Sequence, residues 1–210
     1  MRQSSWGGIA VTVCVLLLAP GAGASNSSAF ADATADAAAP APDLTSVQVT
    51  NDDAGEVVFR ISIPNRTALE DSDFVAVLID ADGKSGTGCA RGTFGAEYAL
   101  DVLARRYFFG RCARGQWSFA GKPASFRGLF SGSTLTLSAN RRDLGGTSGF
   151  AFRIGAAGAG TTDSSYDFAP DVGSSPWSYK LLAPPLSVKN HPTRKRRCRL
   201  HRRCRTTRRR

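Results

Sequence analysis

The stretch of the chain best suited to chemistry is a short acidic loop rich in glycine. Asp80 and Asp82 follow an apolar run at alternate positions, and Gly83, Gly86 and Gly88 come directly after them. Closely spaced carboxylates and backbone carbonyls in a tight loop are the oxygen ligands that Ca²⁺ prefers, although basic residues stand where an EF-hand has acidic ones. Two interpretations stay open: a calcium site, or an Asp-rich turn whose carboxylates accept backbone N–H groups.

Histidine and methionine are nearly absent, which removes several kinds of catalytic and cofactor site. The two histidines, His191 and His201, both lie near the C-terminus, and the only methionine is Met1. The central region therefore has no imidazole for a Ser-His-Asp or Cys-His mechanism, and none for a catalytic zinc site. It also has no His or Met to ligate haem, so we expect no haem.

The acidic residues also allow a catalytic interpretation. Glycosidases use two carboxyl groups that lie about 5–10 Å apart across the scissile bond. Candidates for such a pair are Asp80, Asp82, Asp167 and Asp171. The sequence gives no distance between them, so hydrolysis stays an alternative to simple binding.

Short apolar runs separated by turn signals predict the elements that position these residues. No segment has the 3.6-residue apolar period of a helix, and the strand spacing predicts an all-β sandwich or barrel. Phe74–Ile79 is apolar at almost every position, which predicts a central strand covered on both faces. The glycine-rich segment Gly155–Ser175 is predicted to be a loop. The predicted strands are Ser46–Thr50, Val57–Ile63, Phe74–Ile79, Tyr98–Leu103, Tyr107–Cys112, Gln116–Phe119, Ser125–Phe130, Thr134–Ala139 and Phe150–Ile154.

The chain divides into four parts by composition. Residues 1–24 have the layout of a secretory signal peptide, with Arg2, the apolar run Ile9–Ala19 and small residues at Ala22–Ala24. The apolar run is shorter than the roughly 20 residues of a spanning helix, and an uncleaved anchor is the alternative. Residues 25–42 are rich in Ala, Ser and Pro and predict a flexible linker. Residues 43–183 form the predicted domain, and residues 184–210 a basic tail.

The cysteines fit an exported, oxidised protein. Cys89 and Cys112 lie in the domain and Cys198 and Cys204 in the tail, whereas Cys14 belongs to the signal. Proximity in the sequence favours the pairs Cys89–Cys112 and Cys198–Cys204 among the three possible connectivities.

Two motifs resemble a group of secreted bacterial β-sandwich domains related to the family-nine carbohydrate-binding modules and the DOMON domains. The first is VAVLIDADGKSGTGCARGTFGAEYALDV, and the second is YDFAPDVGSSPWSY. They carry an Asp-x-Asp loop ending at Thr87-Gly88, then Gly95-Ala96-Glu97-Tyr98, and later Ala169-Pro170-Asp171. Glu97 departs from the aspartate that is usual in the group.

This resemblance implies an antiparallel, jelly-roll-like β-sandwich with structural Ca²⁺, and it makes sugar binding an expected function. The implied calcium ligands are Asp80, Asp82, Glu97, Asp167 and Asp171. Aromatic side chains that can stack on a sugar ring are Tyr107, Trp117, Trp177 and Tyr179, with packing inside the fold as the alternative for each tryptophan.

The C-terminal segment accounts for the positive net charge of the chain, and the remainder is nearly neutral. Lys189–Arg210 contains 12 Lys and Arg and no acid, which leaves 15 basic residues against all 17 acidic ones. Such a segment is predicted to be disordered, and its arginines suit phosphate and carboxylate groups. We expect it to adhere to extracellular anionic polymers and expect no specific nucleic acid partner. The residues expected to bind anions are Arg194, Lys195, Arg196, Arg197, Arg199, Arg202, Arg203 and Arg205.

The sequence thus predicts a secreted, non-enzymatic binding module, and association with the cell wall is a further expectation. Its domain is expected to bind a glycan or another component of the cell envelope. A hydrolase with paired carboxylates and a purely structural surface protein are the alternatives.

Overall fold

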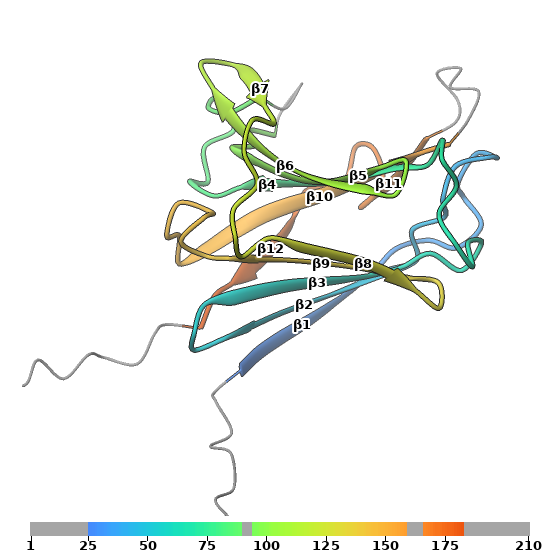
Figure 1. The fold of residues 1–210 in the computed structure, drawn as a ribbon, viewed down its shortest axis with the longest axis horizontal. Helices are drawn as coiled ribbons and strands as arrows, with labels where there is room; N and C mark the ends of the chain where they lie inside the picture. The colour runs from blue at the N-terminus through green and yellow to red at the C-terminus, as the bar shows by residue number, and fades with distance from the viewer. Residues whose placement is uncertain (1–24, 90–93, 159–165, 183–210) are drawn as a thin grey trace, which may run out of the picture.

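The structure is a computed structural model that describes residues 25–89, 94–158 and 166–182. These residues form two antiparallel sheets packed face to face, with no helix among them, so the predicted all-β sandwich is confirmed (Figure 1). The predicted signal peptide, the basic tail and the pair Cys198–Cys204 lie outside the described residues. Among the residues that are described, no helix has the length and apolar character needed to cross a bilayer.

One sheet, which we call sheet A, has five strands in the order β1-β2-β3-β9-β8. Its strands are β1 (Ser25–Ala31), β2 (Ser46–Asp52), β3 (Glu56–Ser62), β8 (Arg127–Ser131) and β9 (Thr134–Asn140). The inward side chains of its central strands are apolar and fully buried, as the alternating pattern predicts. Val47, Val49, Phe59 and Ile61 are examples, each at most 1% exposed.

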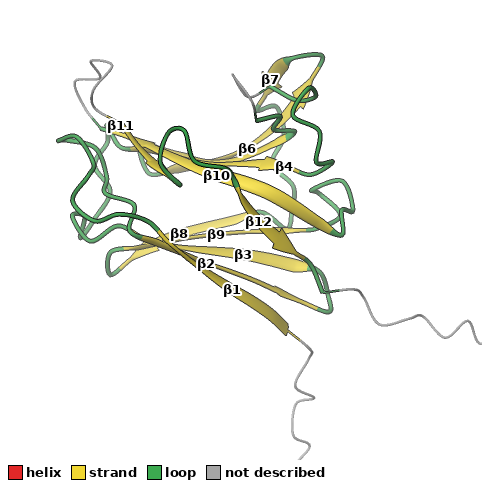
Figure 2. Ribbon diagram, turned by 180° about the vertical axis from the view of Figure 1, so that it is seen from behind, coloured by secondary structure: helices red, strands yellow, loops and turns green. Residues whose placement is uncertain are grey.

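The other sheet, sheet B, has the strand order β11-β10-β4-β5-β6-β7, and β12 pairs with the first half of β10. Its strands are β4 (Phe74–Asp80), β5 (Tyr98–Leu103), β6 (Arg106–Ala113), β7 (Gln116–Ser118), β10 (Gly149–Ala157), β11 (Tyr166–Ala169) and β12 (Trp177–Lys180). Val75, Val77 and Ile79 on β4 point inward with Leu100 and Val102 on β5, and all are fully buried. The strand β7 rises above the outer face of this sheet (Figures 1 and 2).

The predicted flexible linker is wrong over its first part, where the chain forms β1. Ser25–Ala31 pairs with β2 along its whole length. Phe30 fixes β1 to the core, since its ring lies 5.1 Å from that of Phe152 and 5.2 Å from that of Trp177. One aromatic side chain and seven backbone pairings thus order a segment whose composition alone suggests disorder.

The predicted loop Gly155–Ser175 is wrong in part as well. β10 continues through Ala157, and Tyr166–Ala169 forms β11 beside it. The small side chains of this region match a strand because neighbouring large rings cover them. Phe168 of β11, for example, lies over Gly155 of β10.

Candidate binding groove

The outer face of sheet B is apolar, which is unusual for a sheet face with no helix over it in the described part of the chain. β4 turns Phe74, Ala76 and Leu78 outward, and Ala99 and Leu103 of β5 lie on the same face. The outward side chains of sheet A are mostly polar in contrast, and include Gln48, Thr50, Arg60, Thr136 and Ser138. The two outer faces therefore differ in chemistry, and only one of them has the apolar surface of a binding site.

Small residues leave a groove in this face. Ala76 and Ala99 line its floor, and Gly155 on β10 and Gly110 on β6 lie on either side. The groove has a volume of about 290 Å³, close to the lower limit of about 300 Å³ for small-molecule sites. β10 and β6 are three strand spacings apart, about 14 Å, which sets the width of the groove.

Two pairs of aromatic rings form the sides of the groove. Tyr166 and Phe168 of β11 are stacked with their ring centroids 6.2 Å apart. On the opposite side, Trp117 of β7 and Phe119 also have centroids 6.2 Å apart. Phe119 folds back over Gly110, where an added Cβ would come within 2.7 Å of its ring, so glycine is required there. Tyr166 and Phe119 are more than 40% exposed, so their rings are accessible to a ligand.

Asp101 is a buried carboxyl group in this apolar surface. It lies on β5 between Ala76 of β4 and Phe108 of β6, and the residue is only 6% exposed. Its Oδ1 atom is buried and has no hydrogen-bond partner in the protein. Burial raises the pKa of Asp101 from 3.8 to about 7. A buried polar group without a partner is costly, and such groups concentrate at functional sites.

Arg153 of β10 supplies the second polar group of the groove. Its guanidinium donates a hydrogen bond to the carbonyl of Ser174, while its Nε–H is buried without a partner. Arg153 lies two strands and two residues away from Asp101, so their Cα atoms are about 12 Å apart. In the structure the two groups do not bond each other, so the groove offers both an acceptor and a donor.

Of the four aromatic residues predicted to bind a ligand, Trp117 is the one that lines the groove. Tyr179 is 2% exposed and lies within hydrogen-bonding distance of Asn51, so the prediction of a ligand role for it is wrong. Trp177 is half-buried and its ring stacks on that of Phe30. It therefore packs within the fold, which was the alternative to a role in ligand binding. Tyr107 points to the inner side of β6 and packs over Gly128, away from the groove.

The acidic loop after β4 brings three of the predicted calcium ligands together. Carboxylate oxygens of Asp80, Asp82 and Glu97 lie within 4.8 Å of one another. Asp80 accepts the Gly83 N–H at 2.7 Å, and Asp82 accepts the Lys84 N–H at 2.9 Å. These are the hydrogen bonds of the Asp-rich turn, and they leave carboxylate lone pairs that a cation can use.

The Thr87 hydroxyl lies at the centre of this loop. It is within hydrogen-bonding distance of Asp82, of Glu97 at 2.9 Å and of the Lys84 carbonyl at 2.8 Å. A hydroxyl has a single proton, so it can donate to one of these oxygens only. The loop therefore presents more oxygen acceptors than protein donors.

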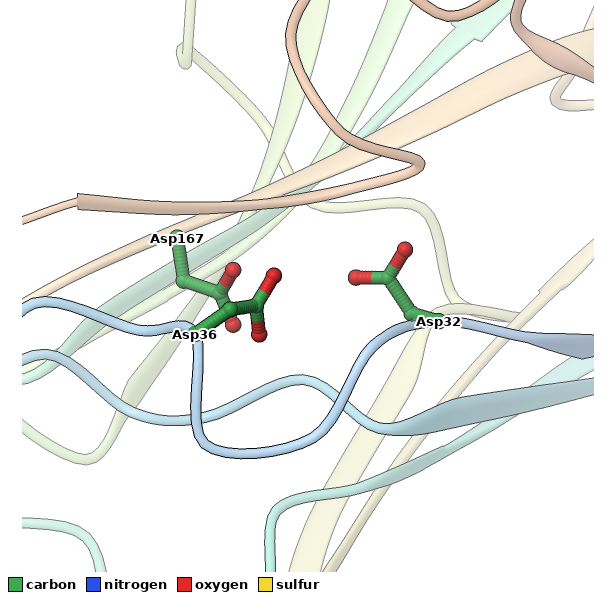
Figure 3. A group of neighbouring side chains, drawn as sticks. All are labelled: Asp32, Asp36 and Asp167. Carbon is green, nitrogen blue, oxygen red and sulfur yellow. The ribbon is translucent and has the colours of Figure 1, made fainter.

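Asp167 does not join this loop and belongs to a second acidic cluster. Figure 3 shows its carboxylate facing those of Asp32 and Asp36, and oxygens of all three lie within 4.8 Å of one another. Asp167 accepts the Leu44 N–H at 2.5 Å, whereas Asp32 has a buried Oδ2 without a partner. Asp32 follows β1, in the segment that composition predicted to be a linker, so the sequence pattern gave no signal for this cluster.

The pKa values of the second cluster reflect its crowded negative charge. Burial, followed by the charges of Asp171, Asp167 and Asp36, raises the pKa of Asp32 to about 7. Burial also raises the pKa of Asp167 to about 6, and its hydrogen bond from Leu44 opposes this rise.

A calcium site shared by the two motifs is ruled out by the strand register. Asp80 pairs with Ala151 of β10, whereas Asp167 pairs with Ala156 of the same strand. Five residues of a strand span about 17 Å, so the two acidic clusters lie near opposite ends of β10. The implied calcium ligands of the two motifs therefore cannot share one ion, although each cluster has the oxygen ligands of a calcium site.

The predicted disulfide between Cys89 and Cys112 is present, with their Cα atoms 5.5 Å apart. It attaches the acidic loop to β6. The Cys89 N–H also bonds the Ala96 carbonyl at 2.9 Å, which closes the base of the same loop.

No protein family, curated protein or solved structure matches the chain. The resemblance to family-nine carbohydrate-binding modules and DOMON domains rests on the two motifs alone, and no family is shown for the chain.

Proposed function

We propose that this protein is a secreted, non-enzymatic binding module that holds a sugar of an envelope glycan in the groove of sheet B. The observation that carries the proposal is a buried carboxyl group, Asp101, in the floor of an open groove with aromatic sides. Aromatic rings pack against the apolar faces of a sugar, while a few fixed polar groups orient its hydroxyls.

The groove favours binding over hydrolysis. A glycosidase needs two carboxyl groups across the scissile bond. Among the described residues that line the groove, Asp101 is the only one with a carboxyl group. Of the four acidic residues first considered for hydrolysis, Asp80, Asp82 and Asp167 lie in the two acidic clusters, and Asp171 also lies outside the groove lining. We therefore keep hydrolysis as an alternative without structural support.

A glycan array and a cell-wall pull-down with the full chain test the proposal. Trp117→Ala should weaken binding about tenfold, since the loss of one stacked ring costs on the order of 1.4 kcal/mol. Leu129→Ala is the matched control, because Leu129 is 62% exposed on sheet A and far from the groove. Absence of binding to any glycan at low salt, or equal binding by both variants, would contradict the proposal.

The acidic clusters support structural calcium as a second part of the proposal. Calcium that binds the folded state alone should raise the melting temperature. Asp36→Ala and Asp82→Ala each disrupt one cluster, so they show which cluster is responsible. A melting temperature that does not respond to calcium would leave the acidic loop as a hydrogen-bonded turn.

The basic tail is proposed to hold the module near an anionic surface. Its arginines match phosphate and carboxylate groups of wall polymers, and this contact does not depend on the groove. The disulfide Cys89–Cys112 is compatible with the oxidising environment of an exported protein.

A further inference from the structure

Asp101 has no basic partner in the described part of the molecule. The ion pairs there join Arg66 to Asp73, Arg105 to Asp71 and Arg111 to Asp143, and none reaches Asp101. The nearest basic side chain of the groove, Arg153, is turned to the Ser174 carbonyl. When Asp101 ionises, its charge is therefore buried without compensation.

The surroundings of Asp101 suit a cation. Phe74, Phe108 and Phe119 line the part of the groove that contains its carboxyl group. The faces of aromatic rings attract ammonium groups, and this attraction grows when the cation is removed from water. A hydroxyl group on a ligand could donate a hydrogen bond to the carboxylate, but it would leave the charge without a counter-charge.

We infer that the sugar held in the groove carries a free primary amine, whose ammonium group pairs with Asp101 between the aromatic rings. This inference rests on the proposed function and names its ligand class: an amino sugar that is not N-acetylated, as in a partly deacetylated glycan. The buried Nε–H of Arg153 then donates to an oxygen atom at the far side of the same ligand.

The titration of Asp101 supports this assignment. Its pKa of about 7 means that burial opposes ionisation. An ammonium group in contact with the carboxylate would favour the charged form and lower this pKa. The other titratable groups lining the groove are Arg153 of β10 and Tyr166 of β11, and the lining residues of β4, β6 and β7 have none. Affinity for the amine should therefore fall as the pH decreases from about 7 to about 5 and Asp101 becomes protonated.

The test compares a short glucosamine oligomer with its fully N-acetylated counterpart by calorimetry on the full chain. N-acetylation removes the charge and keeps the apolar faces of the ring. The glucosamine oligomer should bind at least tenfold more tightly near pH 7, and Asp101→Asn should abolish that preference. The basic tail cannot produce this result, because it repels a cationic ligand.

Two controls separate the groove from the acidic clusters and from misfolding. Asp36→Asn and Asp82→Asn remove charge from each cluster and should leave the preference unchanged. Thermal melting of Asp101→Asn shows whether the variant is folded. Equal affinity for both oligomers, or a preference that survives in Asp101→Asn, would overturn the inference while the groove remains a glycan site. Binding of neither oligomer would also overturn it, whereas the proposed function is judged separately by the glycan array and by the comparison of Trp117→Ala with Leu129→Ala.

Discussion

Asp101 shows how a single residue can link binding to stability. Its pKa is higher in the folded protein than in an unfolded chain, so ionisation opposes folding. The resulting loss of stability is absent below about pH 4 and complete above about pH 7. A neutral residue would be more stable at this position, so the carboxyl group suits a ligand contact.

Asp101→Asn should therefore stabilise the unliganded protein at high pH and not at low pH. The expected gain is roughly 2–4 kcal/mol near pH 8, because each pKa unit corresponds to about 1.4 kcal/mol. Urea denaturation near pH 8 and near pH 4 measures the difference. Asp32 and Asp167 have raised pKa values as well, so some pH dependence of the same sign should remain. A gain of equal size at both pH values would show that Asp101 is not buried as described.

At the scale of the element, β1 extends the sandwich beyond the region that composition predicts to fold. Phe30 packs on Phe152 and Trp177, and Tyr179 contacts the Asn26 carbonyl at 3.0 Å. These contacts connect an edge strand of sheet A to β10 and β12 of sheet B.

Phe30→Ala should lower the free energy of unfolding by about 2 kcal/mol, below the range for a fully buried Phe because the ring is half-buried. Ala29→Ser, on the exposed side of the same strand, should change it by less than about 0.5 kcal/mol. Chemical denaturation of both variants measures these effects. If the two changes have equal, small effects, Ser25–Ala31 would behave as the linker that composition suggests.

Most of the strands could be predicted from sequence because their apolar residues alternate or run continuously between turns. β5 was predicted at its observed bounds, and the observed β4 is one residue longer than predicted. β1, β11 and β12 were missed. β1 is rich in Ala and Ser, which carry little periodic signal, whereas β11 and β12 have only four residues each. The pairing of all three depends on distant strands.

The groove could not be predicted as a site, although the sequence contained one clue. The apolar run Phe74–Ile79 predicted cover on both faces of its strand, and that cover is incomplete: Phe74 and Leu78 are half-buried on the outer face. A chain without a predicted helix has nothing to cover a second apolar face. The position of Asp101 depends on strand register, which single-sequence patterns do not provide.

At the scale of the whole molecule, the proposed account separates two modes of adhesion. The groove recognises a ligand by shape and by one carboxyl group, and the tail adds attraction that depends on charge.

Removing residues 189–210 should leave glycan affinity unchanged and reduce retention on teichoic or uronic polymers. Retention of the full chain should fall steeply with salt because each contact with an anion displaces counterions. Salt-independent retention, or loss of glycan affinity on truncation, would contradict this separation.

Hydrogen exchange of the full chain with and without a glycan selected by the array tests the central claim most directly. The account predicts slower exchange in β4, β5, β7 and β11, which line the groove, and unchanged exchange in β2, β3 and β9 of sheet A. Protection confined to sheet A, or to the acidic loop after β4, would place the ligand elsewhere and contradict the account.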